Sequence, residues 1–133
     1  MKMKFLKLTL LFCLASFALT ISASEQQNGI NYVNAEEAHK LLSENPSIQV
    51  LDVRTAKEFS EGHIAGAINI DYYAKDFEEQ VGTLDTSKTY LVHCRSGGRS
   101  ARSLETLKSA GVQKLVHLDG GMKAWVKGDY PVQ

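Results

Sequence analysis

The sequence predicts a single α/β sandwich built on a mostly parallel sheet. From residue 30 onwards, segments typical of strands alternate with segments typical of helices. The predominantly apolar run at residues 48–53 lacks a polar-apolar alternation, which is typical of a strand covered on both faces, as in parallel sheets. The chain has 133 residues, of which 44% are hydrophobic and 23% charged, so we expect one globular domain rather than disorder or several membrane spans.

The first 24 residues have the pattern of a secretory signal peptide. Three lysines within the first seven residues precede an apolar run at residues 8–21, and small residues follow at 22–24. This run is shorter than the ~18 to 20 residues that a membrane-spanning helix needs. We therefore expect export to the periplasm, cleavage after Ala23 or Ser24, and a mature domain at residues 25–133.

The expected mature chain is slightly acidic and holds one cysteine. Removing residues 1–24 leaves 12 basic and 15 acidic residues, a formal charge of −3, so we expect neither a nucleic-acid surface nor, after cleavage, a membrane surface. Cys13 leaves with the signal, and Cys94 alone does not make a disulfide framework. An unpaired thiol in an oxidising compartment indicates a chemical role.

The first elements follow from local signals. After a polar leader at residues 25–29, residues 30–33 read as a short strand. Asn34 is a favourable N-cap for a helix that runs to the stop at Asn45-Pro46. Residues 48–53 form the next strand.

The remaining elements continue the alternation. They are, in order, a short helix at residues 56–61, a brief strand after Gly66, a helix at 73–81, a strand at 89–93, a helix from 101 ended by Gly111, a strand at 114–118, and a short helix carrying Trp125. In this interpretation Asp52, Cys94 and Asp119 each lie where a strand ends. Ligands of α/β sheets bind at the carboxyl ends of the strands, so we expect a site there.

The loop at residues 94–100, Cys-Arg-Ser-Gly-Gly-Arg-Ser, joins a strand end to a helix start. Successive backbone N–H groups in such a loop, with the positive end of the helix dipole behind them, bind negative charge. Arg95 and Arg99 add two fixed charges, and Gly97 and Gly98 allow positive φ and close approach of an anion.

Cys94 is the candidate nucleophile of this loop. Helix N-termini and nearby arginines lower the pKa of a cysteine thiol, which makes the thiolate available at neutral pH. We expect a small anionic substrate, held by Arg95, Ser96, Gly97, Gly98, Arg99 and Ser100.

Two other interpretations of Cys94 have less support from the sequence. An inert core cysteine is disfavoured, because two arginines and two glycines in the next five positions make a poor core. A zinc site would need His39, His63, His93 or His117, but no paired Cys or His spacing supports one. We therefore expect neither a metal nor an organic cofactor.

Residues 30–132 resemble the rhodanese (thiosulfate sulfurtransferase) domain family, in particular its small, single-domain, exported bacterial type. The motifs that carry the resemblance are Val50 to Arg54 with Glu58-Phe59, Gly62-His63-Ile64 with Gly66-Ala67, the loop at 94–100, and Asp119-Gly120-Gly121 followed by Ala124-Trp125 and Tyr130-Pro131. Ala65 departs from the family, which usually has proline there. The resemblance implies a three-layer sandwich in which helices flank a mostly parallel five-stranded sheet.

The resemblance also implies a reaction. Cys94 would take a sulfane sulfur from thiosulfate or a similar anion, form a persulfide, and pass the sulfur to cyanide, a thiol or an unknown protein acceptor. Arg95 and Arg99 would attract the donor and stabilise the departing sulfite, and the backbone of residues 96–100 would cradle the sulfur.

Two other functions remain open. A cysteine phosphatase or arsenate reductase also places a Cys loop after a strand, but has five residues between its cysteine and arginine, whereas four separate Cys94 from Arg99. The shorter loop suits a sulfur atom better than a tetrahedral oxyanion. The second alternative is a non-catalytic carrier that holds persulfide sulfur for a protein partner.

Several polar residues near the expected site have structural interpretations. We expect Asp52 and Arg54, together with Glu58, to stabilise a strand end by ion pairing, with the alternative that Arg54 reaches the crevice. His93 should point away from the sulfur, since neighbouring residues of a strand face opposite ways. His39 is expected on a solvated helix face.

Overall fold

The computed structural model describes residues 26–27 and 29–133, so the predicted signal segment at 1–24 lies outside the described residues. The strands are β1 (Gln26–Gln27), β2 (Ile30–Val33), β3 (Gln49–Asp52), β4 (Ile68–Asn69), β5 (Thr89–His93) and β6 (Lys114–Leu118). The helices are α1 (Ala35–Glu44), α2 (Ala56–Ser60), α3 (Phe77–Val81), α4 (Gly98–Ser109) and α5 (Gly121–Lys127).

The strands form one sheet in the order β1-β2-β6-β5-β3-β4. From β2 to β4 every neighbouring pair is parallel, which confirms the predicted five-stranded parallel sheet. Leu51 of β3 pairs with Val92 of β5, and Val92 pairs with His117 of β6. Because these central strands run in one direction and in register, the residues that follow them emerge at one edge of the sheet.

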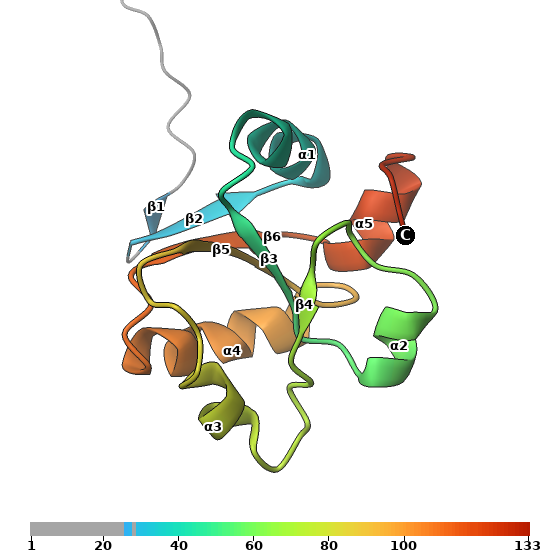
Figure 1. The fold of residues 1–133 in the computed structure, drawn as a ribbon. Coiled ribbons are helices and arrows are strands. Elements are labelled where there is room, and N and C mark those ends of the chain that lie inside the picture. The colour runs from blue at the N-terminus through green and yellow to red at the C-terminus, as the bar shows by residue number, and fades with distance from the viewer. Residues whose placement is uncertain (1–25, 28) are drawn as a thin grey trace, which may run out of the picture.

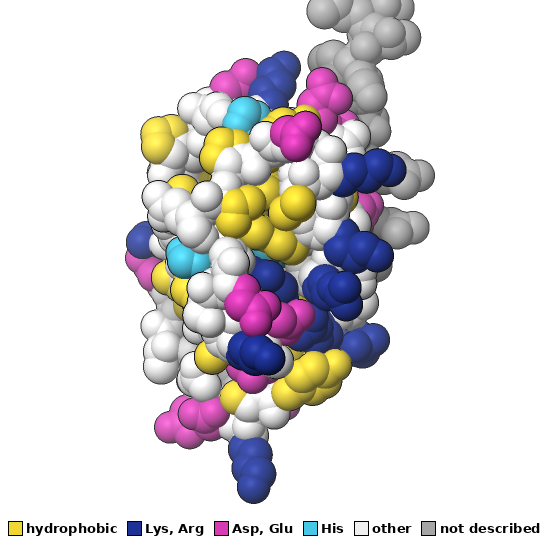
Figure 2. Space-filling view, turned by 90° about the vertical axis from the view of Figure 1, so that its right-hand side faces the viewer, with side chains coloured by type: hydrophobic (Ala, Val, Ile, Leu, Met, Phe, Trp, Pro, Cys, Tyr) yellow, Lys and Arg dark blue, Asp and Glu magenta, His cyan; other side chains and the backbone are white. Residues whose placement is uncertain are grey.

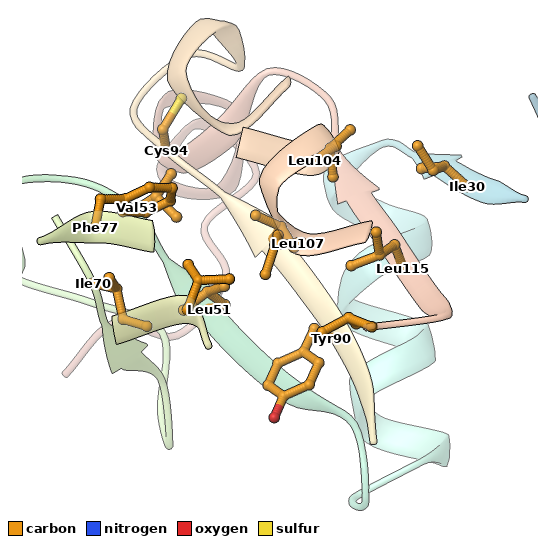
Figure 3. Close-up of a cluster of buried hydrophobic side chains, with 13 residues drawn as sticks. Ile30, Leu51, Val53, Ile70, Phe77, Tyr90, Cys94, Leu104, Leu107 and Leu115 are labelled. Atoms are coloured by element: carbon orange, nitrogen blue, oxygen red, sulfur yellow. The ribbon is translucent and has the colours of Figure 1, made fainter. Parts of the chain in front are cut away.

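Helices cover both faces of the sheet, which gives the predicted three layers. Helices α1 and α5 lie on one face and α3 and α4 on the other (Figure 1). Leu51 and Leu107 belong to the cluster under α3 and α4, and Figure 3 shows this cluster with Cys94 at one end. Leu91 and Trp125 belong to the cluster on the other face.

Three segments differ from the sequence prediction. Two residues of the polar leader form β1, which pairs antiparallel with β2 at the edge of the sheet. The helix expected at residues 73–81 begins only at Phe77, because the Asp71 carboxylate accepts the Tyr73 N–H and holds a turn there. Helix α4 begins at Gly98 rather than at residue 101.

Among residues 26–27 and 29–133, no helix is both long enough and apolar enough to cross a membrane.

Helix α5 is joined to the cysteine loop by backbone hydrogen bonds. The N–H of Met122 donates to the carbonyl of Cys94, and the N–H of Lys123 donates to that of Arg95, both at 2.9 Å. Gly121 has φ +56°, and a β carbon there would lie 2.5 Å from the Cys94 carbonyl oxygen. Glycine is therefore required for the start of α5 to lie against the loop.

Gly121→Ala should destabilise the protein more than Gly66→Ala. Gly66 also has a positive φ, +75°, but a β carbon there would meet nothing within 4 Å, so only the backbone cost of about 1–2 kcal/mol applies. At Gly121 the added methyl group also displaces the backbone of the loop. Urea unfolding of both variants measures the difference, and equal losses of stability would contradict the role given to this contact.

Candidate functional site

Cys94 follows β5 and lies at the base of the loop that leads into α4. It is 1% exposed, and Figure 3 shows its sulfur directed away from Leu51 and Ile70. Its Sγ accepts the Gly97 N–H at 3.1 Å and lies 3.4 Å from the Ser100 hydroxyl oxygen. Gly97 has φ +108°, and this left-handed turn aims the loop amides inward.

Hydrogen bonds lower the pKa of the Cys94 thiol below its usual value. Burial alone acts in the opposite direction and is the largest single influence. The Ser100 hydroxyl and the backbone N–H groups of Ser100, Gly97 and Ser96 together outweigh it. The loop therefore favours a thiolate, the nucleophilic form of cysteine.

His117, which the sequence suggests only as a candidate zinc ligand, lies beside the cysteine loop. Its Nε2 lies 2.7 Å from the Ser100 hydroxyl oxygen, and its Nδ1 lies 2.9 Å from Asp119 Oδ1. His117 is 3% exposed and Ser100 is fully buried. A continuous set of hydrogen-bonding atoms thus runs from Asp119 to Cys94.

Arg99 does not carry a free charge at the loop. Its guanidinium forms two parallel hydrogen bonds with the Glu58 carboxylate, at 2.8 and 2.9 Å. Glu58 was expected to pair near Asp52 and Arg54, so this partner is a correction. The ion pair raises the pKa of Arg99 further above its usual range, and it anchors the start of α4 to α2.

Three buried side chains at the ends of β3 and β5 stabilise the cysteine loop: Asp52, Arg54 and His93. Arg54 binds the Asp52 carboxylate through Nε and Nη2, and Nη2 also donates to the Gly62 carbonyl at 2.7 Å, as expected for an ion pair that stabilises the strand end. His93 Nδ1 lies 3.0 Å from the Cys94 carbonyl oxygen. Burial lowers the pKa of His93, so its ring is neutral and positions the backbone rather than acting on the sulfur.

An open cavity of about 530 Å³ lies beside the loop, between α2, α5 and the C-terminal residues. Its lining residues are Arg54, Glu58, Glu61, Gly62, Arg95, Met122, Lys123, Val126, Lys127 and Val132. Figure 2 looks onto this side of the molecule and shows hydrophobic side chains gathered beside basic and acidic ones. The exposed Arg95 thus lies at the cavity, and Arg54 reaches it as well as pairing with Asp52.

The remaining predicted residues lie as follows. Ser96 and Gly98 are exposed on the loop, and Gly98 has no positive φ, contrary to the expectation, because it already belongs to α4. His39 is half-buried and stacks on Tyr130 with ring centroids 4.6 Å apart, so the solvated position predicted for it is wrong. Among residues 26–27 and 29–133, no group of three or more His, Cys, Asp or Glu side chains is arranged to hold a metal ion.

Residues 34–128 match the model of the rhodanese-like domain family. The chain belongs to this family. Among curated rhodanese-like relatives, it is 36% identical to thiosulfate sulfurtransferase 16, chloroplastic, from Arabidopsis thaliana, over 83% of this chain and 98% of the relative. It is 27% identical to the putative sulfur carrier protein YrkF of Bacillus subtilis, over 77% of this chain and 55% of the relative.

Solved structures agree with the rhodanese-like assignment. The crystal structure of a rhodanese-related protein from Thermoplasma volcanium superposes with a TM-score of 0.66 at 36% identity, covering 77% of this chain and 96% of the other. The family thus includes both sulfurtransferases and sulfur carriers, whose substrates are sulfur donors and acceptors.

The ion pair between Glu58 and Arg99 should stabilise this rhodanese-like domain only above acidic pH. The Arg99 hydrogen bonds, with smaller contributions from Thr55, lower the pKa of Glu58 from 4.5 to about 2 despite burial. A lowered folded-state pKa gives stability that is complete above the unfolded value and is lost as pH falls through the folded value. The stability difference between wild type and Glu58→Gln should therefore shrink between pH 4.5 and about 2.

Urea unfolding across that pH range measures this difference. The glutamine carbonyl oxygen can keep the Thr55 hydrogen bonds that cap α2, whereas its NH2 group cannot accept from Arg99 Nη2. The variant therefore removes the charge and one Arg99 hydrogen bond while the cap of α2 is retained. A difference that stays constant down to about pH 2 would contradict the assignment of the lowered pKa to Glu58.

Proposed function

We propose that this protein is a sulfurtransferase that moves a sulfane sulfur from thiosulfate or a similar small anion to a thiol or cyanide through a Cys94 persulfide. The observation that carries the proposal is the buried Cys94 Sγ, which receives hydrogen bonds from the loop at the end of β5. The similarity to proteins named thiosulfate sulfurtransferase supports the choice of donor.

The first step is a displacement at sulfur. The Cys94 thiolate attacks the outer sulfur of thiosulfate, a Cys94 sulfur–sulfur bond forms, and the sulfur–sulfur bond of the donor breaks. The electron pair of the broken bond leaves with sulfite, and the enzyme retains a persulfide anion. Thiosulfate and sulfite carry the same charge, so the negative charge at Cys94 is conserved.

The second step returns the enzyme to its first state. A nucleophilic acceptor, such as cyanide or a thiolate, attacks the outer sulfur of the persulfide and expels the Cys94 thiolate. The hydrogen bonds that stabilise the thiolate at the start also stabilise it as a leaving group here, because the negative charge returns to the same Sγ. Neither step requires a metal ion or an organic cofactor.

The same loop bears on the two alternative functions. A phosphatase or arsenate reductase needs donors for several oxygens of a tetrahedral anion, whereas the Gly97 N–H and the Ser100 hydroxyl lie at hydrogen-bonding distance from the sulfur itself. A carrier would use the same persulfide without rapid turnover, and the similarity to a putative sulfur carrier supports this second candidate.

The N-terminal sequence pattern supports the further proposal that the protein acts in the periplasm.

Incubation with thiosulfate should add one sulfur to the reduced protein, a gain of ~32 Da by intact-mass spectrometry, with release of sulfite. Cys94→Ser should show neither change, because its hydroxyl is not ionised near neutral pH. A mass gain in Cys94→Ser would contradict the nucleophile, and no gain in folded wild type would contradict thiosulfate as donor. With thiosulfate and cyanide both in excess, an enzyme forms many equivalents of thiocyanate per protein in the assay time, whereas a carrier forms about one.

Removing the Arg95 charge should weaken donor binding. Arg95 is exposed at the cavity beside the loop, so Arg95→Ala should raise the KM for dianionic thiosulfate about two- to fivefold, with a smaller effect at high salt. Lys40→Ala removes an exposed positive charge on α1 and serves as the matched control. Steady-state kinetics at two salt concentrations measure the effect, and an equal KM change in both variants would exclude a local role for Arg95.

A further inference from the structure

We propose that Asp119, His117 and Ser100 form a proton-transfer chain that carries the thiol proton of Cys94 away from the sulfur. The proposal rests on the proposed function in one respect, the assignment of Cys94 as the nucleophile. It adds three positioning residues that act on Cys94 from the far side of the loop. Each neighbouring pair lies within reach: 2.9 Å from Asp119 to His117, 2.7 Å from His117 to Ser100, and 3.4 Å from Ser100 to Cys94.

The chemistry of the groups sets the direction of the hydrogen bonds. An ionised carboxylate only accepts, so Asp119 Oδ1 accepts a proton from His117 Nδ1. In the neutral ring Nε2 is then the acceptor, and the Ser100 hydroxyl donates to it. The Ser100 hydroxyl, when it donates to His117, no longer donates to the Gly97 carbonyl at 3.1 Å or to Cys94 Sγ at 3.4 Å. Its oxygen then accepts from the S–H of Cys94.

When Cys94 ionises, two hydrogen bonds reverse their direction: the one between Cys94 and Ser100 and the one between Ser100 and His117. The thiol proton passes to the Ser100 oxygen while the Ser100 hydroxyl proton passes to His117 Nε2, which becomes protonated. The charged ring donates to Ser100, and the Ser100 hydroxyl donates to the thiolate. No proton leaves the chain, and His117 donates to Asp119 in both states, so the thiolate and the imidazolium form together.

The surroundings of His117 favour this role over a general structural one. Asp119 stabilises the charged ring, and its side chain is 60% exposed, which connects the buried ring to water. The ring of Tyr32, in β2, packs edge to face against the His117 ring, with the ring centroids 5.5 Å apart. Among the described residues, His93 of β5 interacts electrostatically with His117, and Arg99 of α4 interacts with Cys94 and is paired with Glu58.

The test is the pH dependence of Cys94 alkylation by iodoacetamide, measured by mass spectrometry. Only the thiolate reacts, and no sulfur donor is involved, so the result is independent of whether thiosulfate is a substrate. His117→Gln removes the titratable ring but retains a polar side chain. It should slow alkylation near pH 6 about tenfold and leave the rate at high pH unchanged, which separates loss of thiolate from loss of access.

Asp119→Asn provides a second, more conservative variant. Its side chain is exposed, so folding is retained, and the neutral amide no longer stabilises the charged ring. Its alkylation profile should change in the same direction as that of His117→Gln. His39→Gln is the matched histidine control and should leave the profile unchanged, because His39 lies in α1 and stacks on Tyr130.

A double-mutant cycle identifies the route. Ser100→Ala interrupts the chain, so adding His117→Gln to it should cause no further slowing. Thermal unfolding confirms that each variant is folded. Wild-type alkylation in both His117→Gln and Asp119→Asn would overturn the proposal, as would effects of Ser100→Ala and His117→Gln that simply add. Failure of thiosulfate to load Cys94 would overturn the proposed donor and leave the chain intact.

Discussion

A thiolate at Cys94 is stable only if the protein supplies the hydrogen bonds that water would otherwise provide, because this residue is almost wholly buried. This requirement explains the arrangement at the end of β5. The chain turns through Gly97 in a left-handed conformation, its amides face inward, and the Ser100 hydroxyl approaches from the first turn of α4. The Ser100 hydroxyl is in turn within hydrogen-bond distance of His117, which lies outside the loop.

The parallel sheet and the helices around it hold that loop in place. β5 lies between β3 and β6, so the polar groups that follow these three strands meet at one edge. Asp52 orients Arg54 there, and Asp119 orients His117. From α5, the N–H groups of Met122 and Lys123 donate to the Cys94 and Arg95 carbonyls. The loop is thus supported from the sheet and from a helix distant in sequence.

Sequence reasoning recovers the parts of the site that are local in the chain. The loop at residues 94–100 is a continuous motif, and the strand ends at Asp52, Cys94 and Asp119 follow from hydrophobic patterning and the rule for α/β sheets. The partners of Arg99 and His117 were missed because Glu58 is 41 residues from Arg99 and Ser100 is 17 residues from His117. His117 faces the same side of β6 as Leu115, toward α4. This orientation could be predicted only if the side of the sheet that α4 covers were already known.

The charges around the cysteine divide into two groups with different effects. Arg54 and Arg99 are paired with Asp52 and Glu58, so their charges are largely compensated and they act mainly on geometry. Arg95 is exposed at the cavity with Lys123, where positive charge acts on an approaching anion. In the proposed function, changes at the cavity surface should therefore alter the attraction of the donor without disturbing the hydrogen bonds to Sγ. The proposed transferase and the alternative carrier would therefore use the same hydrogen bonds at Sγ, and the cavity surface would act on the approach of the donor.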